Sequence, residues 1–300
     1  MSSIVVLGDV NVDILSLISG EINYASDTSA INRLAVGGSP CNMAAWAAHS
    51  KAQVTLIADV GNDFLGQWLI DQLHTGSIAT ELISRTPERT GTCVIIVDDK
   101  GQRTMFPDFG ANLDMTLDDI RTNAIRDARY LVMSAYTFLR PETQSLALQA
   151  LEIAKAANTR VVVDAASSAP IRACGAVTVR TYLEQADIVL ANDDEIEALI
   201  EDGFSNWLQT LPNVIIKHGS EGASWLSRGR LRVELPANDI SVVDTTGAGD
   251  ALCGGLVAAL VALPELEALT SEQQQGALQS AIDIASVCCQ HIGAWPTSGS

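Results

Sequence analysis

Three residues with almost no side chain, Gly247, Ala248 and Gly249, stand directly before an acidic residue, Asp250. A strand-like run at 240–243 leads into them and a helix of small residues follows, so their N–H groups can converge on one anion at a helix start. A carboxylate would repel that anion. Its position makes chemical sense if Asp250 accepts the proton of a hydroxyl that attacks a phosphate. An ordinary glycine turn with Asp250 as the helix cap is the alternative, and the segment alone does not decide between them.

A second glycine-rich element, Ala35-Val-Gly-Gly-Ser-Pro-Cys-Asn42, also opens a predicted helix. Gly37 and Gly38 permit close approach of a ligand to the backbone, and Asn42 would project from the first turn. Asn11 and Asp13 follow the first strand, where we expect them at the carboxyl edge of the sheet as acceptors for the hydroxyls of a polyol. A loop that only caps a helix is the alternative for the glycines.

Two further elements carry charge at predicted strand ends. Asn192 and Glu195 share a helical face after a strand and could hold Mg²⁺ or its waters beside nucleotide phosphates, or form only an acidic first helical turn. Lys217 ends another strand before the turn at Gly219 and Gly222. That turn could line a nucleotide or simply close a hairpin.

Alternating strands and helices must position these motifs. Short apolar runs rich in β-branched residues predict buried strands at 4–7, 54–58, 130–133, 161–163, 188–190 and 214–216. Helical spacing predicts helices at 41–49, 65–74, 142–157, 195–200, 251–263 and 271–290. This order is typical of βαβ units, so the predicted fold is α/β, with a central, mostly parallel sheet covered by helices on both faces.

Two stretches interrupt that order. Residues 14–35 lack helical periodicity, and residues 90–106 are typical of a hairpin with its turn at Asp99-Lys-Gly101. We expect both to form a small β-sheet over the carboxyl ends of the parallel strands, where it would act as a lid.

Composition limits the partners of the chain. Its 300 residues are 47% hydrophobic, and 36 acidic against 18 basic residues give a net charge of −18. Nucleic acid and anionic membranes are therefore excluded as expected partners, because binding them needs a basic face. The six cysteines form no C-x-x-C pair, and the N-terminus resembles a strand more than a signal peptide. We expect a cytoplasmic protein with reduced cysteines.

In this order, the four motifs resemble those of the PfkB, or ribokinase-like, family of carbohydrate and nucleoside kinases. Asp244-Thr-Thr-Gly-Ala-Gly-Asp250 looks like its C-terminal signature, and Gly37 to Asn42 like its N-terminal one. The resemblance implies one kinase domain over 1–300, Rossmann-like, with lid insertions at about 14–35 and 88–112. It also implies ATP-dependent phosphorylation of a sugar hydroxymethyl group, with Mg²⁺.

The resemblance also implies roles for individual residues. Asp250 resembles the catalytic base, and the amides of Gly247, Ala248 and Gly249 resemble the anion hole. The residues similar to sugar contacts are Asn11, Asp13, Gly37, Gly38 and Asn42. Those similar to nucleotide contacts are Asn192, Lys217, Gly219, Ser220 and Gly222, with Glu195 acting on Mg²⁺ through water. Asp244 and Thr246 would help bind a monovalent cation such as K⁺, near Cys288, His291, Gly293 and Thr297.

Departures from the ribokinase pattern leave the substrate open. The N-terminal loop has Ser39-Pro-Cys where ribokinases have Lys-Gly-Ala, and Ala135-Tyr136 stands where they carry a substrate-binding Glu. Arg103, at the end of the hairpin, could reach the carboxylate of an acidic sugar. A nucleoside kinase of the same fold and a catalytically silent sugar- or nucleotide-binding regulator remain the alternatives. A second copy could cover the edges of the lid, so a homodimer through the lid is expected.

Overall fold

The structure, a computed structural model of the chain, describes residues 3–99 and 102–296. Within them a nine-stranded sheet has the order β13-β12-β11-β10-β9-β8-β1-β4-β5, and a separate four-stranded sheet has the order β3-β2-β6-β7. The strands of the large sheet are β1 (Ile4–Leu7), β4 (Val54–Gly61), β5 (Ile83–Thr86), β8 (Tyr130–Ser134), β9 (Arg160–Asp164), β10 (Ile188–Asn192), β11 (Val214–Lys217), β12 (Ala223–Ser227) and β13 (Arg230–Leu235). All neighbours from β5 to β11 are parallel, and β12 and β13 are antiparallel. The six predicted strands are all confirmed.

Helices cover both faces of this sheet. One face packs against α1 (Ser39–His49), α2 (Phe64–Thr75), α9 (Ala248–Val261) and α10 (Ser271–Cys289). The other packs against α3 (Asp119–Asp127), α5 (Pro141–Ala157), α6 (Ser168–Cys174), α7 (Ala176–Leu183) and α8 (Asp193–Ile200), with the short α4 (Tyr136–Leu139) among them. In β1, Ile4 and Val6 join the first core while Val5 and Leu7 join the second. A strand buried on both faces is apolar throughout, which is why these runs were recognisable.

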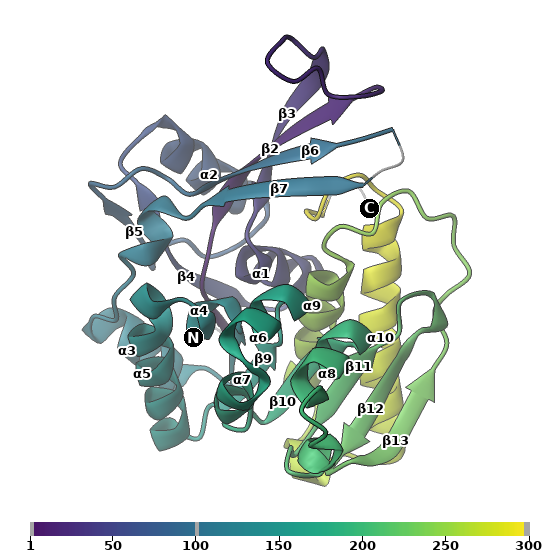
Figure 1. The fold of residues 1–300 in the computed structure, drawn as a ribbon. Coiled ribbons are helices and arrows are strands. Elements are labelled where there is room, and N and C mark those ends of the chain that lie inside the picture. The colour runs from purple at the N-terminus through teal and green to yellow at the C-terminus, as the bar shows by residue number, and fades with distance from the viewer. Residues whose placement is uncertain (1–2, 100–101, 297–300) are drawn as a thin grey trace.

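The four-stranded sheet, called here the small sheet, consists of β2 (Asn11–Ile18), β3 (Ala30–Gly37), β6 (Thr92–Val97) and β7 (Arg103–Asp108). Figure 1 shows it at the top of the molecule, above α1 and α9. The predicted hairpin is present, since β6 and β7 pair antiparallel. Of its predicted turn, Lys100 and Gly101 lie outside the described residues. Asn11 and Asp13 belong to β2 of the small sheet, which corrects their expected place at the end of the first strand of the large sheet.

The predicted strand at 240–243 is wrong. The segment is irregular, and Val242 and Val243 expose 60% and 57% of their surface. The N–H groups of Val243 and Asp244 donate to the carbonyl of Cys289 at the end of α10, at 2.8 and 3.2 Å. Backbone groups satisfied in this way need no strand partner.

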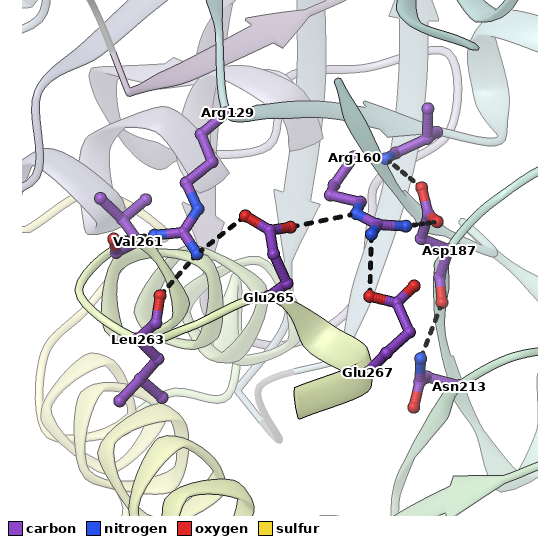
Figure 2. Close-up of polar contacts among 9 residues, drawn as sticks. Arg129, Arg160, Asp187, Asn213, Val261, Leu263, Glu265 and Glu267 are labelled. Carbon is purple, nitrogen blue, oxygen red and sulfur yellow. Dashed lines mark hydrogen bonds and ion pairs between the residues drawn. The ribbon is translucent and has the colours of Figure 1, made fainter. Parts of the chain in front are cut away.

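Charged groups hold the strands together at the amino end of the large sheet, away from the motifs. Arg160, which begins β9, contacts Asp187 at 3.0 Å and Glu267 at 2.8 Å, and Figure 2 shows Glu265 between Arg160 and Arg129. Asp187 also accepts from the amide of Val161 at 2.8 Å. No helix in the described ranges is long and apolar enough to cross a membrane.

Candidate active site

Helix α9 places Asp250 in its first turn. The helix begins at Ala248, three residues before the predicted start at 251, and its cap is Gly247 with φ 76°. A Cβ on Gly247 would lie 2.5 Å from the Cβ of Ala294, so only glycine fits this left-handed position. The first N–H groups of a helix have no partner within it. The amide of Ala248 was expected to be part of the anion hole. In this structure it donates to the carbonyl of Thr245 at 3.2 Å.

The carboxylate of Asp250 is held by two side chains from α1. Ser39 donates to one oxygen at 2.7 Å, and the Asn42 amide donates to the other at 2.9 Å. Burial raises the pKa of Asp250 to about 7, against the opposing effect of these two hydrogen bonds. Asn42 Oδ1 is itself buried without a hydrogen-bond partner among the described residues. A buried acceptor left open in this way is suited to a ligand hydroxyl.

Asp13 lies close to the same place. A Cβ on Gly37 would come within 2.2 Å of an Asp13 carboxylate oxygen, which explains the need for glycine there. Burial raises the pKa of Asp13 to about 7. Burial raises the pKa of the Cys41 thiol, and the charges of both Asp13 and Asp250 raise it further. The two carboxylates therefore both lie within electrostatic range of this one thiol.

Asn11 is oriented by a residue that the sequence analysis missed. Asn112, in the short 3-10 helix Gly110–Leu113, donates to Asn11 Oδ1 at 2.8 Å and accepts from the Val10 amide at 3.0 Å. Gly38 (φ 97°) completes this region, because a Cβ there would lie 2.4 Å from the carbonyl oxygen of Asp9. The predicted sugar contacts other than Arg103 thus come together around β2 and the start of α1.

The carboxyl ends of β9, β10 and β11 gather the predicted nucleotide contacts. The register pairs Asn192 with Lys217, and Leu190 with Asp164. Lys217 Nζ lies 2.6 Å from Asp164 and 3.9 Å from Glu195. Asp164 was missed, although its place at the end of a predicted parallel strand was a signal, because such ends meet at one edge of a sheet.

Lys217 connects this edge to α9. A Cβ on Gly249 would lie 3.2 Å from Lys217 Nζ, so the ammonium approaches the helix start closely. Burial alone would lower the pKa of Lys217, but the carboxylates of Asp164 and Glu195 raise it. The lysine therefore stays charged beside the expected anion hole.

Asn192 and Glu195 form a reciprocal cap at the start of α8. The Asn192 oxygen accepts from the Glu195 amide, and the Glu195 carboxylate accepts from the Asn192 backbone N–H, each at 2.8 Å. Burial raises the pKa of Glu195. The motif thus forms an acidic first helical turn, and the Glu195 carboxylate in it also faces Lys217.

The turn after β11 closes an antiparallel hairpin with β12 through the 3-10 helix Gly219–Glu221. Gly222 has φ 109°, and a Cβ there would lie 2.0 Å from the Leu235 carbonyl oxygen. His218 contacts Asp193 at 2.9 Å and Ser224 at 2.8 Å, so the turn with Gly219 and Ser220 lies beside the start of α8.

Asp244 is enclosed by donors. Thr246 donates to Oδ1 from its amide at 2.8 Å and from its hydroxyl at 2.6 Å, and the Gly293 amide donates to Oδ2 at 2.8 Å. Arg103, expected to reach an acidic ligand, forms an ion pair with Asp244 instead. Cys288 Sγ lies 3.3 Å from the Thr246 carbonyl oxygen, whereas Thr297 lies outside the described residues.

No group of three or more His, Cys, Asp or Glu side chains that could enclose a metal occurs in residues 3–99 and 102–296. Mg²⁺ often keeps several waters and binds through one or two carboxylates plus substrate phosphates. Asp164 and Glu195 at one sheet edge fit that mode of binding.

Comparison with known proteins agrees with this geometry. The family model of the pfkB family carbohydrate kinases matches residues 1–298. An ATP-dependent ribose-1-phosphate kinase of Halopiger xanaduensis is 32% identical over 253 residues, covering 83% of this chain and 79% of the relative. A ribokinase of Staphylococcus aureus is 27% identical, covering 86% of each chain. Among solved structures, a fructokinase of Xylella fastidiosa with bound ATP superposes with a TM-score of 0.83 at 18% identity, covering 99% of this chain and 96% of that one. The fold is thus ribokinase-like, and the chain belongs to the pfkB family of carbohydrate kinases, phosphotransferases that act on an alcohol group.

Proposed function

We propose that the chain transfers the γ-phosphoryl group of ATP to the hydroxymethyl group of a sugar, with Asp250 as the general base. The observation that supports this most is the position of the Asp250 carboxylate. It lies in the first turn of α9, fixed by Ser39 and Asn42, with a pKa of about 7. A general base works best when its pKa is close to the operating pH.

In the proposed reaction the acceptor hydroxyl gives its proton to Asp250 while its oxygen forms a bond to the γ-phosphorus. The bond between that phosphorus and the bridging oxygen breaks, and ADP leaves. The first amides of α9, Gly247, Ala248 and Gly249, would stabilise the charge on the transferred group, and Lys217 adds a positive charge beside them. In this state the Ala248 amide would exchange its bond to Thr245 for one to the phosphoryl group.

Asn42 Oδ1, Asp13 and Asn11 would accept hydrogen bonds from sugar hydroxyls. Asn11 and Asn42 are buried and Asp13 is partly buried, and Asn42 Oδ1 has no hydrogen-bond partner among the described residues, so it is open to a donor. Asn192, Gly219, Ser220 and Gly222 would line the nucleotide beside Lys217. Mg²⁺ would be held through water by Glu195 with Asp164, and when bound it would neutralise phosphate charge.

The small sheet would act as a lid, with its insertions within one kinase domain over 1–300. Leu34, Val94 and Phe106 share one face of it by register, opposite Asp13, and expose 48%, 38% and 54% of their surface. Exposed apolar side chains on a sheet with two edge strands, β3 and β7, support a homodimer through the lid.

The test is ADP release with a panel of ribose, fructose, 2-keto-3-deoxygluconate, ribose 1-phosphate and adenosine. Asp250→Asn should lower kcat about 10²–10⁴-fold for the accepted substrate, while calorimetry shows ATP binding largely retained. Asp239→Asn, the same change at an exposed position, is the matched control. Retention of more than about a tenth of kcat in Asp250→Asn would remove Asp250 as base. Ligand binding without any ADP release would favour a regulator.

A further inference from the structure

Arg103 reaches from the small sheet to the segment that leads into α9. It is the first residue of β7, and the register β2–β6–β7 pairs Leu17 with Val97 and Val97 with Arg103. Leu17 lies four residues after Asp13 on β2, so Arg103 and Asp13 share one face of the sheet. Its guanidinium forms the ion pair with Asp244, 141 residues away in the chain.

The pair is largely withdrawn from solvent. The Arg103 side chain is 26% exposed and that of Asp244 is 7% exposed. The hydrogen bonds from Thr246 and Gly293 and the guanidinium of Arg103 all favour the charged form of the Asp244 carboxyl. The carboxylate is thus a fixed anion that needs a compensating positive charge.

The family resemblance implies a monovalent cation at Asp244, and the residues present do not fit one well. Oδ1 already accepts from the Thr246 amide, the Thr246 hydroxyl and Arg103, and Oδ2 accepts from the Gly293 amide. A metal cation would have to displace the guanidinium or lie beside it, where the two positive charges repel each other.

We propose that the Arg103 guanidinium takes the place of the monovalent cation at Asp244, so that catalysis does not depend on K⁺. Arg103 is then a positioning residue: it neutralises Asp244, which orders Thr246 and Gly293 at the entrance to the anion hole. Because Arg103 belongs to β7, the same contact also ties the small sheet to the start of α9. This inference rests on the proposed kinase function.

The first experiment measures kcat and KM in K⁺, Na⁺ and tetramethylammonium chloride at constant ionic strength. Wild type should vary less than twofold among the salts. Arg103→Ala should lose about tenfold or more of kcat in tetramethylammonium, because a charged hydrogen bond is lost, and should recover part of it in K⁺ or with added guanidinium. Arg103→Lys should keep most of the activity and remain insensitive to K⁺.

Arg33→Ala is the matched control, because Arg33 is an exposed arginine on the same sheet, and it should behave as wild type. Activation of the wild type several-fold by K⁺ would overturn the proposal. So would an Arg103→Ala enzyme with nearly normal kcat in tetramethylammonium.

A second readout does not need turnover. The melting temperature of ligand-free Arg103→Ala should rise in K⁺ relative to tetramethylammonium, whereas that of wild type should be equal in the two salts. A K⁺ effect that is equal in both proteins would contradict the replacement of a cation by Arg103. If no acceptor is phosphorylated, the proposed function fails, and this melting comparison still decides the role of Arg103.

Discussion

Ser39 donates a hydrogen bond of 2.7 Å to Oδ1 of Asp250, although 211 residues separate the two in the chain. The serine belongs to the first turn of α1 and the aspartate to the first turn of α9. Two helix starts from opposite ends of the sequence therefore meet at one carboxylate. Because the hydroxyl bonds the charged form, it opposes the rise in pKa that burial causes.

The pH profile should show Asp250 as a base with a pKa near 7. Only the carboxylate can accept a proton, so kcat/KM for the acceptor should be level above about pH 8 and fall as pH decreases through 7. The Asp13 carboxyl also has a pKa of about 7. If its charged form is needed too, the acid limb becomes steeper in wild type than in Asp13→Asn. A profile that stays flat down to pH 5 would contradict the assignment.

Ser39→Ala should shift the acid side of the kcat/KM profile to higher pH. Without the hydroxyl donor the charged form of Asp250 is less stable, so its pKa rises and kcat/KM at pH 7 falls several-fold. Activity should return toward the wild-type level at pH 9, where the carboxyl is ionised in both proteins. Ser280→Ala, on the exposed side of α10, is the control. An equal loss at pH 7 and pH 9 would mean that Ser39 acts in some other way.

Asp13→Asn should stabilise the protein at high pH. The folded-state pKa of Asp13 is about 7, against an ordinary value of 3.8, so the folded state binds this proton more tightly than the unfolded state does. That contribution to stability is full below about pH 4 and is lost as pH rises through 7. We expect a melting temperature about 2 °C or more above wild type at pH 8, where about 1 kcal/mol corresponds to 2–4 °C. The gain should be smaller at pH 5 and disappear below about pH 4, and a variant less stable at both pH 8 and pH 5 would contradict the burial of a charge there.

Lys217→Met should destabilise the protein and weaken ATP binding. It leaves Asp164 and Glu195 as buried carboxylates without their cation, and removing one partner of a buried pair costs about 3–5 kcal/mol. Urea unfolding should show that loss at pH 8 and a smaller one at pH 5. Lys217→Met combined with Asp164→Asn should regain part of the stability. Lys155→Met, at an exposed site at the end of α5, should change little.

Phe106→Lys should convert the proposed dimer to a monomer. The substitution introduces a charge among Leu34, Val94 and Phe106 on the small sheet, where two copies would repel each other. Light scattering after size exclusion would report the mass. Phe64→Lys, at a phenylalanine 77% exposed on α2, is the control. A wild type that is monomeric at micromolar concentration would remove the proposal.

The fold could be predicted well because its strands are apolar on both faces. In β1, four consecutive buried residues alternate between two cores, and such runs cannot be confused with loops. The strand predicted at 240–243 is wrong, although it was predicted from the same feature, a run of β-branched apolar residues. Its β-branched residues favour a strand, but no neighbouring strand pairs with it.

The site could be predicted only where its residues are neighbours in sequence. The stretch from Asp244 to Asp250 is one turn and one helix start, so it is visible in a single string of letters. Ser39, Asn112 and Asp164 gain their roles from partners that the fold brings to them. Arg103 is an example of a residue whose partner could not be predicted from the sequence. The residue type predicted a carboxylate partner, and the path of β7 makes that partner Asp244.

The ion pairs of Arg129 and Arg160 at the amino end of the large sheet have a consequence for the diversity of such enzymes. They link the amino ends of β8 and β9 to the segment after α9, at the edge of the sheet opposite the carboxyl ends of the strands. Loops at the opposite rim can then be exchanged by mutation without loosening the frame. The acceptor specificity can thereby change through these loops while the large sheet and its ion pairs stay the same.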